Sequence, residues 1–207
     1  MRDGEPDRAG ADRFAVAVAA MRAFLAIPLT SPALEAGTEL LDDLRAAVGA
    51  VRWVRPEGLH LTLHFWPALD GLDVTRVVDA ARDPVRRHPR YEMTLGGLGA
   101  FPRDGDERVL WLGMRSGEAQ TVALQGDVET ALESAGFPRE QRAYHPHLTL
   151  GRPRARLDDA TRVRWRDFAG FALPPCAVEE VRLYRSHPGP GGSRYEVLER
   201  LPLDAPA

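Results

Sequence analysis

The stretch HLTLHF at residues 60–65 recurs as HLTLGR at residues 147–152. The chain contains six histidines, too few for the same four-residue run to recur readily by chance. The repeat, with a similar order of elements around each copy, predicts two related lobes. Several neighbouring strands are separated only by short turns, which favours antiparallel or mixed sheets with flanking helices. The expected fold class is therefore α+β, with two related lobes around a central cleft.

Alternation within each copy predicts which side chains share a face. Successive side chains of a strand point to opposite faces. His60 and Thr62 then lie on one face, and the leucines between and after them enter the core on the other. His147 and Thr149 are related in the same way. Each copy presents an imidazole beside a hydroxyl, at a spacing of roughly 6.5–7 Å along the strand.

Two imidazoles and two hydroxyls around one cleft suit phosphodiester chemistry. An imidazole has an ordinary pKa of about 6.5, so it exists in either form at neutral pH. One histidine can take a proton from the attacking water while the other gives a proton to the departing oxygen. The hydroxyls can donate hydrogen bonds to the non-bridging oxygens. No metal or other cofactor is required, and we expect His60 to be the acid and His147 the base.

The composition limits the alternatives. Formal net charge is −3, and all 27 basic residues are arginine, so covalent lysine intermediates are excluded. The single cysteine, Cys176, excludes an internal disulfide framework, and a reducing cytoplasm fits best. No apolar run approaches the roughly 20 residues that span a bilayer, so no membrane association is expected. Residues 1–20 are predicted to be a disordered extension, and residues 21–207 a single bilobal domain.

Local patterns predict the order of the elements. Ser31 and Pro32 are expected to open the first helix, and Pro84 is expected to interrupt the second. Strands are expected within 21–29, 53–66, 91–101, 108–115, 145–152, 178–186 and 193–201, and helices within 31–50, 71–88, 117–136 and 156–168.

Aromatic and basic side chains near the motifs offer further candidates. Phe24 and Phe65 are expected in the core, whereas Tyr144, just before the second motif, is the better candidate for stacking on a base. His64 would either line the cleft or face solvent at the end of its strand. A run of arginines begins at Arg152, and the positions after it are expected to be mainly a solvated surface that could steer an RNA end: Arg154, Arg156, Arg162, Arg164 and Arg166.

The chain resembles a known family through its two His-x-Thr motifs and through MRAFLAI, FPRDGDERVLWLG and LYRSHPGPGGSRYEVL. It is similar to the two-histidine phosphoesterases, specifically the bacterial and archaeal RNA 2′,3′-cyclic phosphodiesterases, also called 2′-5′ RNA ligases. The resemblance covers most of residues 21–200. It implies a bilobal fold and metal-independent opening of 2′,3′-cyclic phosphates, on RNA 3′ ends or cyclic nucleotides, to give 2′-phosphates. No obligatory protein partner is implied.

The resemblance also implies roles for particular residues. The family's histidines, threonines and phosphate-binding arginine match His60, Thr62, His147, Thr149 and Arg152. The chain departs from the family after the first motif, where a lysine is common and this chain has His64. A Gly-Glu pair is likewise replaced by Trp66 and Pro67.

Other chemistries fit the motifs less well. His145 and His147 could serve a metal hydrolase, but no carboxylate with suitable spacing occurs nearby. A histidine-triad nucleotide hydrolase would need a third histidine where Thr149 stands. Hydrolysis of 2′-5′ linked oligonucleotides remains a close enzymatic alternative. A non-catalytic RNA-end binding protein is an alternative of another class.

Overall fold

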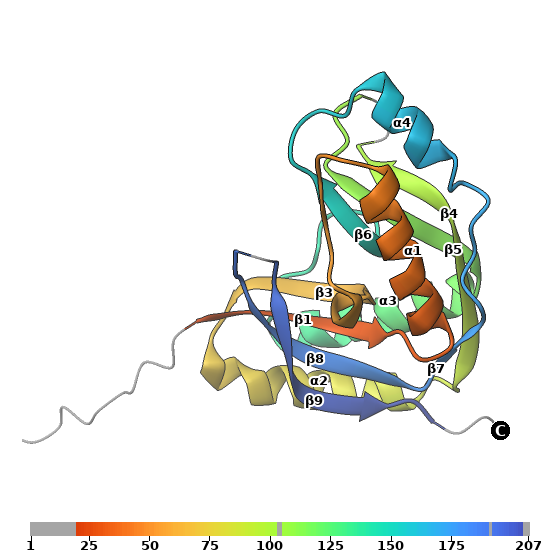
Figure 1. Ribbon diagram of the computed structural model, residues 1–207. Helices are drawn as coiled ribbons and strands as arrows, with labels where there is room; N and C mark the ends of the chain where they lie inside the picture. Colours follow the sequence, from red (N-terminus) through yellow and green to blue (C-terminus); the bar gives the residue numbers. More distant parts are fainter. Residues whose placement is uncertain (1–19, 103–104, 191, 205–207) are drawn as a thin grey trace, which may run out of the picture.

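The computed structural model describes residues 20–102, 105–190 and 192–204, and its course is drawn in Figure 1. The strands are β1 (Met21–Pro28), β2 (Val51–Trp53), β3 (His60–Leu69), β4 (Tyr91–Phe101), β5 (Val109–Ser116), β6 (Leu148–Pro153), β7 (Cys176–Val178), β8 (Glu180–His187) and β9 (Arg194–Pro202). The helices are α1 (Ala33–Ala47), α2 (Val74–Arg86), α3 (Glu118–Ser134) and α4 (Asp159–Arg166), with short turns η1 (Pro56–Gly58) and η2 (Gly71–Asp73). The extension predicted at residues 1–20 lies outside the described residues, except for residue 20.

The strands form a sheet in the order β7-β4-β5-β6-β3-β1-β8-β9, with β2 beside β6. All pairings between named strands in the described ranges are antiparallel, and the α+β class is confirmed. The two halves of the sheet meet where β6 pairs with β3. The chain crosses between the halves several times, because β1, β3, β8 and β9 belong to one half and β2, β4, β5, β6 and β7 to the other. Neither half is one continuous stretch of sequence, which explains why no linker separates them.

Each half of the sheet has its own helices. Helix α2 lies against β8, β9 and α3, and α3 contacts β3 (Figure 1). Helix α1 contacts α4 and β2 in the other half. The buried residues of α2 include Val77, Val78, Ala81 and Val85, which form one apolar stripe along the helix. Among the described helices, none has the length and apolar character needed to cross a membrane.

Two expectations about helix boundaries were wrong. Helix α2 is not interrupted at Pro84 but continues to Arg86 with the proline buried inside it. Pro84 lacks the N–H that would bond to the carbonyl of Ala80, so the helix loses one hydrogen bond there, while the buried ring packs with the apolar residues of the helix. The first helix is not capped by Ser31: Pro32 occupies the cap position without any side-chain hydrogen bond.

Strand β2 was not predicted, because three residues are too short to show a period. It pairs with β6, with Trp53 opposite Gly151. A Cβ atom on Gly151 would lie 2.7 Å from both the Trp53 ring and the Val51 side chain. A glycine is therefore required here for β2 to pack closely against the second motif strand.

Candidate active site

The two motif strands meet at one residue pair, Leu61 opposite Leu148. Both leucines are fully buried in the main hydrophobic core. Alternation places their neighbours on the opposite face of the sheet, which we call the site face. Two histidine–threonine pairs flank the leucines there, by continuation of the antiparallel register: His60 with Thr149, and Thr62 with His147.

In this array the two histidines are diagonal neighbours. Diagonal positions on adjacent antiparallel strands lie roughly 7–8 Å apart. The positive charge of His147 lowers the pKa of His60, as expected for two rings at such close range. A phosphoryl group can fit between two such rings with hydrogen bonds of about 2.8 Å on each side. The structure thus brings together the four motif residues selected from the sequence.

A one-residue bulge follows each motif and changes which side chains reach the site face. Between the β3 pairings of Thr62 with Ala26 and of His64 with Leu25, Leu63 is an extra residue. In β6, Leu150 is the extra residue in the same way, after Thr149 and before Gly151. A bulge shifts the alternation by one residue. The fifth residue after each histidine therefore returns to the site face: Phe65 in β3 and Arg152 in β6.

The His60 ring is enclosed by aromatic side chains of the same face. Phe24 stacks on it at 4.6 Å between ring centroids, and Tyr195 meets it edge-on at 5.3 Å. The ring nitrogen Nδ1 donates a hydrogen bond of 2.7 Å to the carbonyl of Gly58. Since a carbonyl only accepts, Nδ1 carries the proton, and Nε2 of the neutral ring remains able to accept another. A Cβ atom at Gly58 would approach the Tyr195 ring to 3.1 Å.

His147 has a matching environment. Its Nδ1 donates a 2.7 Å hydrogen bond to the carbonyl of His145, two residues before it, as in the His60–Gly58 contact. Phe101 meets the ring edge-on at 5.1 Å, and Trp111 lies at 6.1 Å. Both histidines therefore have the same tautomer in their neutral form, with Nε2 as the reactive nitrogen.

The surroundings lower the pKa of both histidines. The pKa of His60 is lowered to about 4. Burial is the largest cause, the hydrogen bond to Gly58 acts in the opposite direction, and the charge of His147 lowers the pKa further. Burial also lowers the pKa of His147, against the hydrogen bond to His145, and the charges of His145 and Arg152 lower it further. Arg152 returns to the same face of β6 as His147, through the bulge at Leu150.

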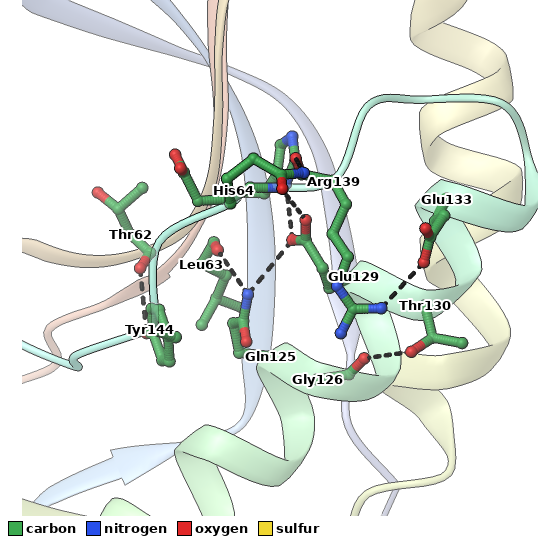
Figure 2. A network of polar contacts seen from close by, with 12 residues as sticks. Thr62, Leu63, His64, Gln125, Gly126, Glu129, Thr130, Glu133, Arg139 and Tyr144 are labelled. Carbon is green, nitrogen blue, oxygen red and sulfur yellow. Dashed lines mark hydrogen bonds and ion pairs between the residues drawn. The ribbon is translucent and has the colours of Figure 1, made fainter.

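His64 neither lines the site nor faces solvent, so both expectations for it were wrong. The bulge at Leu63 turns its ring into the core, where it is 7% exposed. Its Nδ1 lies 2.8 Å from Oε2 of Glu129 on α3 (Figure 2). The Gln125 amide also donates to Glu129, at 3.3 Å, and approaches the Leu63 carbonyl at 3.5 Å. A buried polar network therefore ties the bulge to α3.

The same carboxylate also holds the loop that leads to the second motif. Oε1 of Glu129 accepts a 2.7 Å hydrogen bond from the backbone N–H of Glu140. Further along the loop, the Tyr144 hydroxyl donates a 3.0 Å hydrogen bond to the carbonyl of Thr62 (Figure 2). These contacts connect the first motif strand to the segment that positions His147. No sequence pattern indicated Glu129, because its contact with His64 joins residues 65 positions apart.

The aromatic candidates are placed differently from one another. Phe24 is buried, as expected, but in a small cluster with Ala26 and Tyr184 on the site face rather than in the main core. Phe65 is 43% exposed, so the core prediction for it was wrong; the bulge has moved it out. Tyr144 packs against the main core, and burial raises the pKa of its hydroxyl. Base stacking by Tyr144 remains a prediction.

The arginine run after the second motif is mostly exposed. Arg152 is exposed on the site face, whereas Arg162 is bound to Glu107 at 2.9 Å and 3.1 Å. Within the described ranges, no group of three or more His, Cys, Asp or Glu is placed to hold a metal ion. The pair His145 and His147 is joined instead through the backbone carbonyl of the former.

Comparison with known proteins gives a consistent result. A family model described as the 2′-5′ RNA ligase superfamily matches residues 31–190. The chain is 33% identical over 180 residues to the RNA 2′,3′-cyclic phosphodiesterase of Methanothermobacter thermautotrophicus, covering 86% of this chain and 97% of that protein. The protein of the same name from Thermotoga maritima is 29% identical over 181 residues, covering 86% of this chain and 93% of that one.

Solved structures share the fold. The protein TT0787 of Thermus thermophilus superposes with a TM-score of 0.73 at 24% identity, over 89% of this chain and 99% of that one. Escherichia coli LigT, solved in complex with 3′-AMP, gives a TM-score of 0.68 at 28% identity, over 89% of this chain and 98% of that one.

Proposed function

The chain belongs to the 2′-5′ RNA ligase superfamily, and from this membership and the geometry of the site we propose that it hydrolyses 2′,3′-cyclic phosphates of RNA ends or nucleosides to 2′-phosphates. The observation that carries the proposal is the Leu61–Leu148 pairing, which sets His60 and His147 diagonally across one face. Two imidazoles with reactive Nε2 atoms can act on opposite sides of one phosphorus. The reaction requires no metal, no other cofactor and no ATP, and a cytoplasmic location fits it.

The environments of the two histidines favour particular roles. Burial and the charge of His147 lower the pKa of His60 to about 4, so its ring is neutral at neutral pH and its Nε2 can accept a proton. We therefore assign His60 as the base that takes the proton of water and His147 as the acid that protonates the departing 3′-oxygen. This is the reverse of the assignment expected from the sequence. Thr62, Thr149 and Arg152 hold the non-bridging oxygens as charge builds on them.

The same site can also accept a hydroxyl in place of water as the attacking group. A ribose 5′-hydroxyl in place of water would lose its proton to the base while its oxygen bonds to phosphorus. The P–O3′ bond would break, and the 3′-oxygen would receive the proton of the acid. The product is a 2′-5′ linkage, formed without ATP. We expect this ligation to be weak, because water at a concentration on the order of 50 M competes for the position of the attacking hydroxyl.

The test is turnover of 2′,3′-cyclic AMP in excess chelator, with the product identified by phosphorus NMR. A 2′-monophosphate supports the proposal, whereas no turnover or loss of activity with EDTA contradicts it. His60→Ala and His147→Ala should each lower turnover by about 10²–10⁴. A p-nitrophenyl nucleotide ester, whose leaving group needs no proton, separates the roles: His147→Ala should regain activity on it, and His60→Ala should not.

A further inference from the structure

The two halves of the site are related by an approximate two-fold axis through the Leu61–Leu148 pair. Each half has the same sequence of features: histidine, leucine, threonine, a bulged leucine, and then a side chain returned to the site face. In the β6 half this returned side chain is Arg152. In the β3 half it is Phe65. The position that offers a guanidinium on one side of the site therefore offers an aromatic ring on the other.

Phe65 is unusual for a phenylalanine in that almost half of its surface is open to solvent. It is 43% exposed, and its register partner on β1 is Phe24, the residue that stacks on His60. The guanidinium of Arg22 lies over the Phe65 ring, 5.4 Å from its centroid. A ring and a cation are thus combined on the site face: Phe65 lies on the same strand as His60, and Arg22 lies on the neighbouring strand β1.

Arg22 is a cation that forms no ion pair with a carboxylate of the described residues. The strand register connects it to the site: Arg22 is paired with Ser186 on β8, and Ser186 is paired with Tyr195 on β9. Tyr195 meets the His60 ring edge-on, so Arg22 lies two strands away from a ring of the cluster around that histidine.

We propose that Phe65 and Arg22 form a subsite for a second nucleotide, the one upstream of the cyclic end of a single-stranded RNA. Its base would stack on the Phe65 ring, and its phosphate would pair with the Arg22 guanidinium. Exposed aromatic rings bind bases of any sequence, and arginine suits a phosphate through bidentate contact. A cyclic mononucleotide has one base and one phosphate, and both belong to the reacting nucleotide. It therefore has no second base for Phe65 and no second phosphate for Arg22. The inference rests on the proposed function and deepens it: the preferred substrate is an RNA end, not a mononucleotide.

The test compares two substrates that end in a 2′,3′-cyclic phosphate: the mononucleotide A>p, which is 2′,3′-cyclic AMP, and the linear dinucleotide ApA>p. Phe65→Ala should lower kcat/KM for the dinucleotide by about tenfold or more, the size of one base stack, and change the mononucleotide value by less than about twofold. Phe65→Tyr should restore the preference. Arg22→Gln should reduce the dinucleotide preference and its salt dependence. The control is Leu72→Ala, an exposed apolar side chain on η2, which should change neither substrate.

Equal losses on both substrates, or no loss on the dinucleotide, would overturn the subsite. As a further assay, kcat/KM is measured for cleavage of a 2′-5′ linked ApA dinucleotide. A loss of kcat/KM on this substrate alone would also overturn the subsite, because it would place the Phe65 ring on the leaving-group side of the scissile phosphate. If the unmodified protein turns over neither cyclic substrate, the proposed function fails, and calorimetric binding of the 2′-phosphorylated dinucleotide then tests the subsite separately. Phe65→Ala should weaken that binding by a similar factor; unchanged affinity would overturn it.

Discussion

Replacing Glu129 with leucine should destabilise the protein strongly, since one carboxylate satisfies donors from three parts of the chain. Leucine has a similar volume but accepts nothing, so the His64 ring and the Glu140 N–H lose their partners, while Gln125 keeps only its 3.5 Å approach to Leu63. A buried donor left unpaired costs about 1–3 kcal/mol, and breaking a buried pair costs about 3–5 kcal/mol. Because the Glu140 contact is only partly buried, we expect a loss of about 3–4 kcal/mol.

Urea unfolding gives the change in free energy, and a thermal melt should shift by roughly 6–15 °C for a chain of this size. The matched control is Glu133→Gln, one turn later on α3, whose side chain is 52% exposed beside Arg139. That variant should stay within about 0.5 kcal/mol of the parent. Below its melting temperature, Glu129→Leu should also lower kcat more than it raises KM, because the loop before His147 is loosened. A loss below about 1 kcal/mol with unchanged kcat would refute this account of the network.

Three further outcomes follow from the same geometry. The profile of kcat/KM against pH should peak below about pH 6.5. Activity falls toward alkaline pH as His147 loses its proton, and toward acid pH as His60 gains one near its pKa of about 4. A plateau extending to about pH 8 would contradict the lowered pKa values of the two histidines. Tyr195→Ala should admit water to His60, raise its pKa toward about 6.5 and move the acid limb upward, whereas Tyr195→Phe should leave the limb in place. Gly99→Ala should cost about 1–3 kcal/mol in denaturant unfolding, because its Cβ would lie 2.1 Å from the Trp111 ring; the control Gly126→Ala, in open space on α3, should instead stabilise by about 0.5–1 kcal/mol.

The repeated motif was sufficient to predict the four residues that meet on one face, as well as the family. Alternation is a property of any extended strand, so His60 and Thr62 share a face whatever surrounds them. The α+β class followed from the short turns between strands, and it is confirmed. These predictions succeeded because they depend on a few neighbouring residues and on strand geometry alone.

Alternation failed where tertiary pairing inserted an extra residue. Nothing in HLTLHF distinguishes a regular strand from one with a bulge at Leu63, since the bulge is defined by the register with β1. That single residue sends His64 into the core and brings Phe65 out, the reverse of what a regular strand would do. The equivalent bulge at Leu150 returns Arg152 to the site face.

By itself, the sequence determined which chemical groups are available, two imidazoles and two hydroxyls in matched pairs, and that the chain alternates between strands and helices. Only the tertiary structure decided that β3 and β6 meet at Leu61 and Leu148, which fixes the distance across the site. It also decided how strongly each imidazole holds its proton, because burial by rings from distant strands, such as Phe24 and Tyr195, lowers the pKa of His60. The physical reason is that register and desolvation arise from contacts between segments far apart in sequence, which no local pattern encodes.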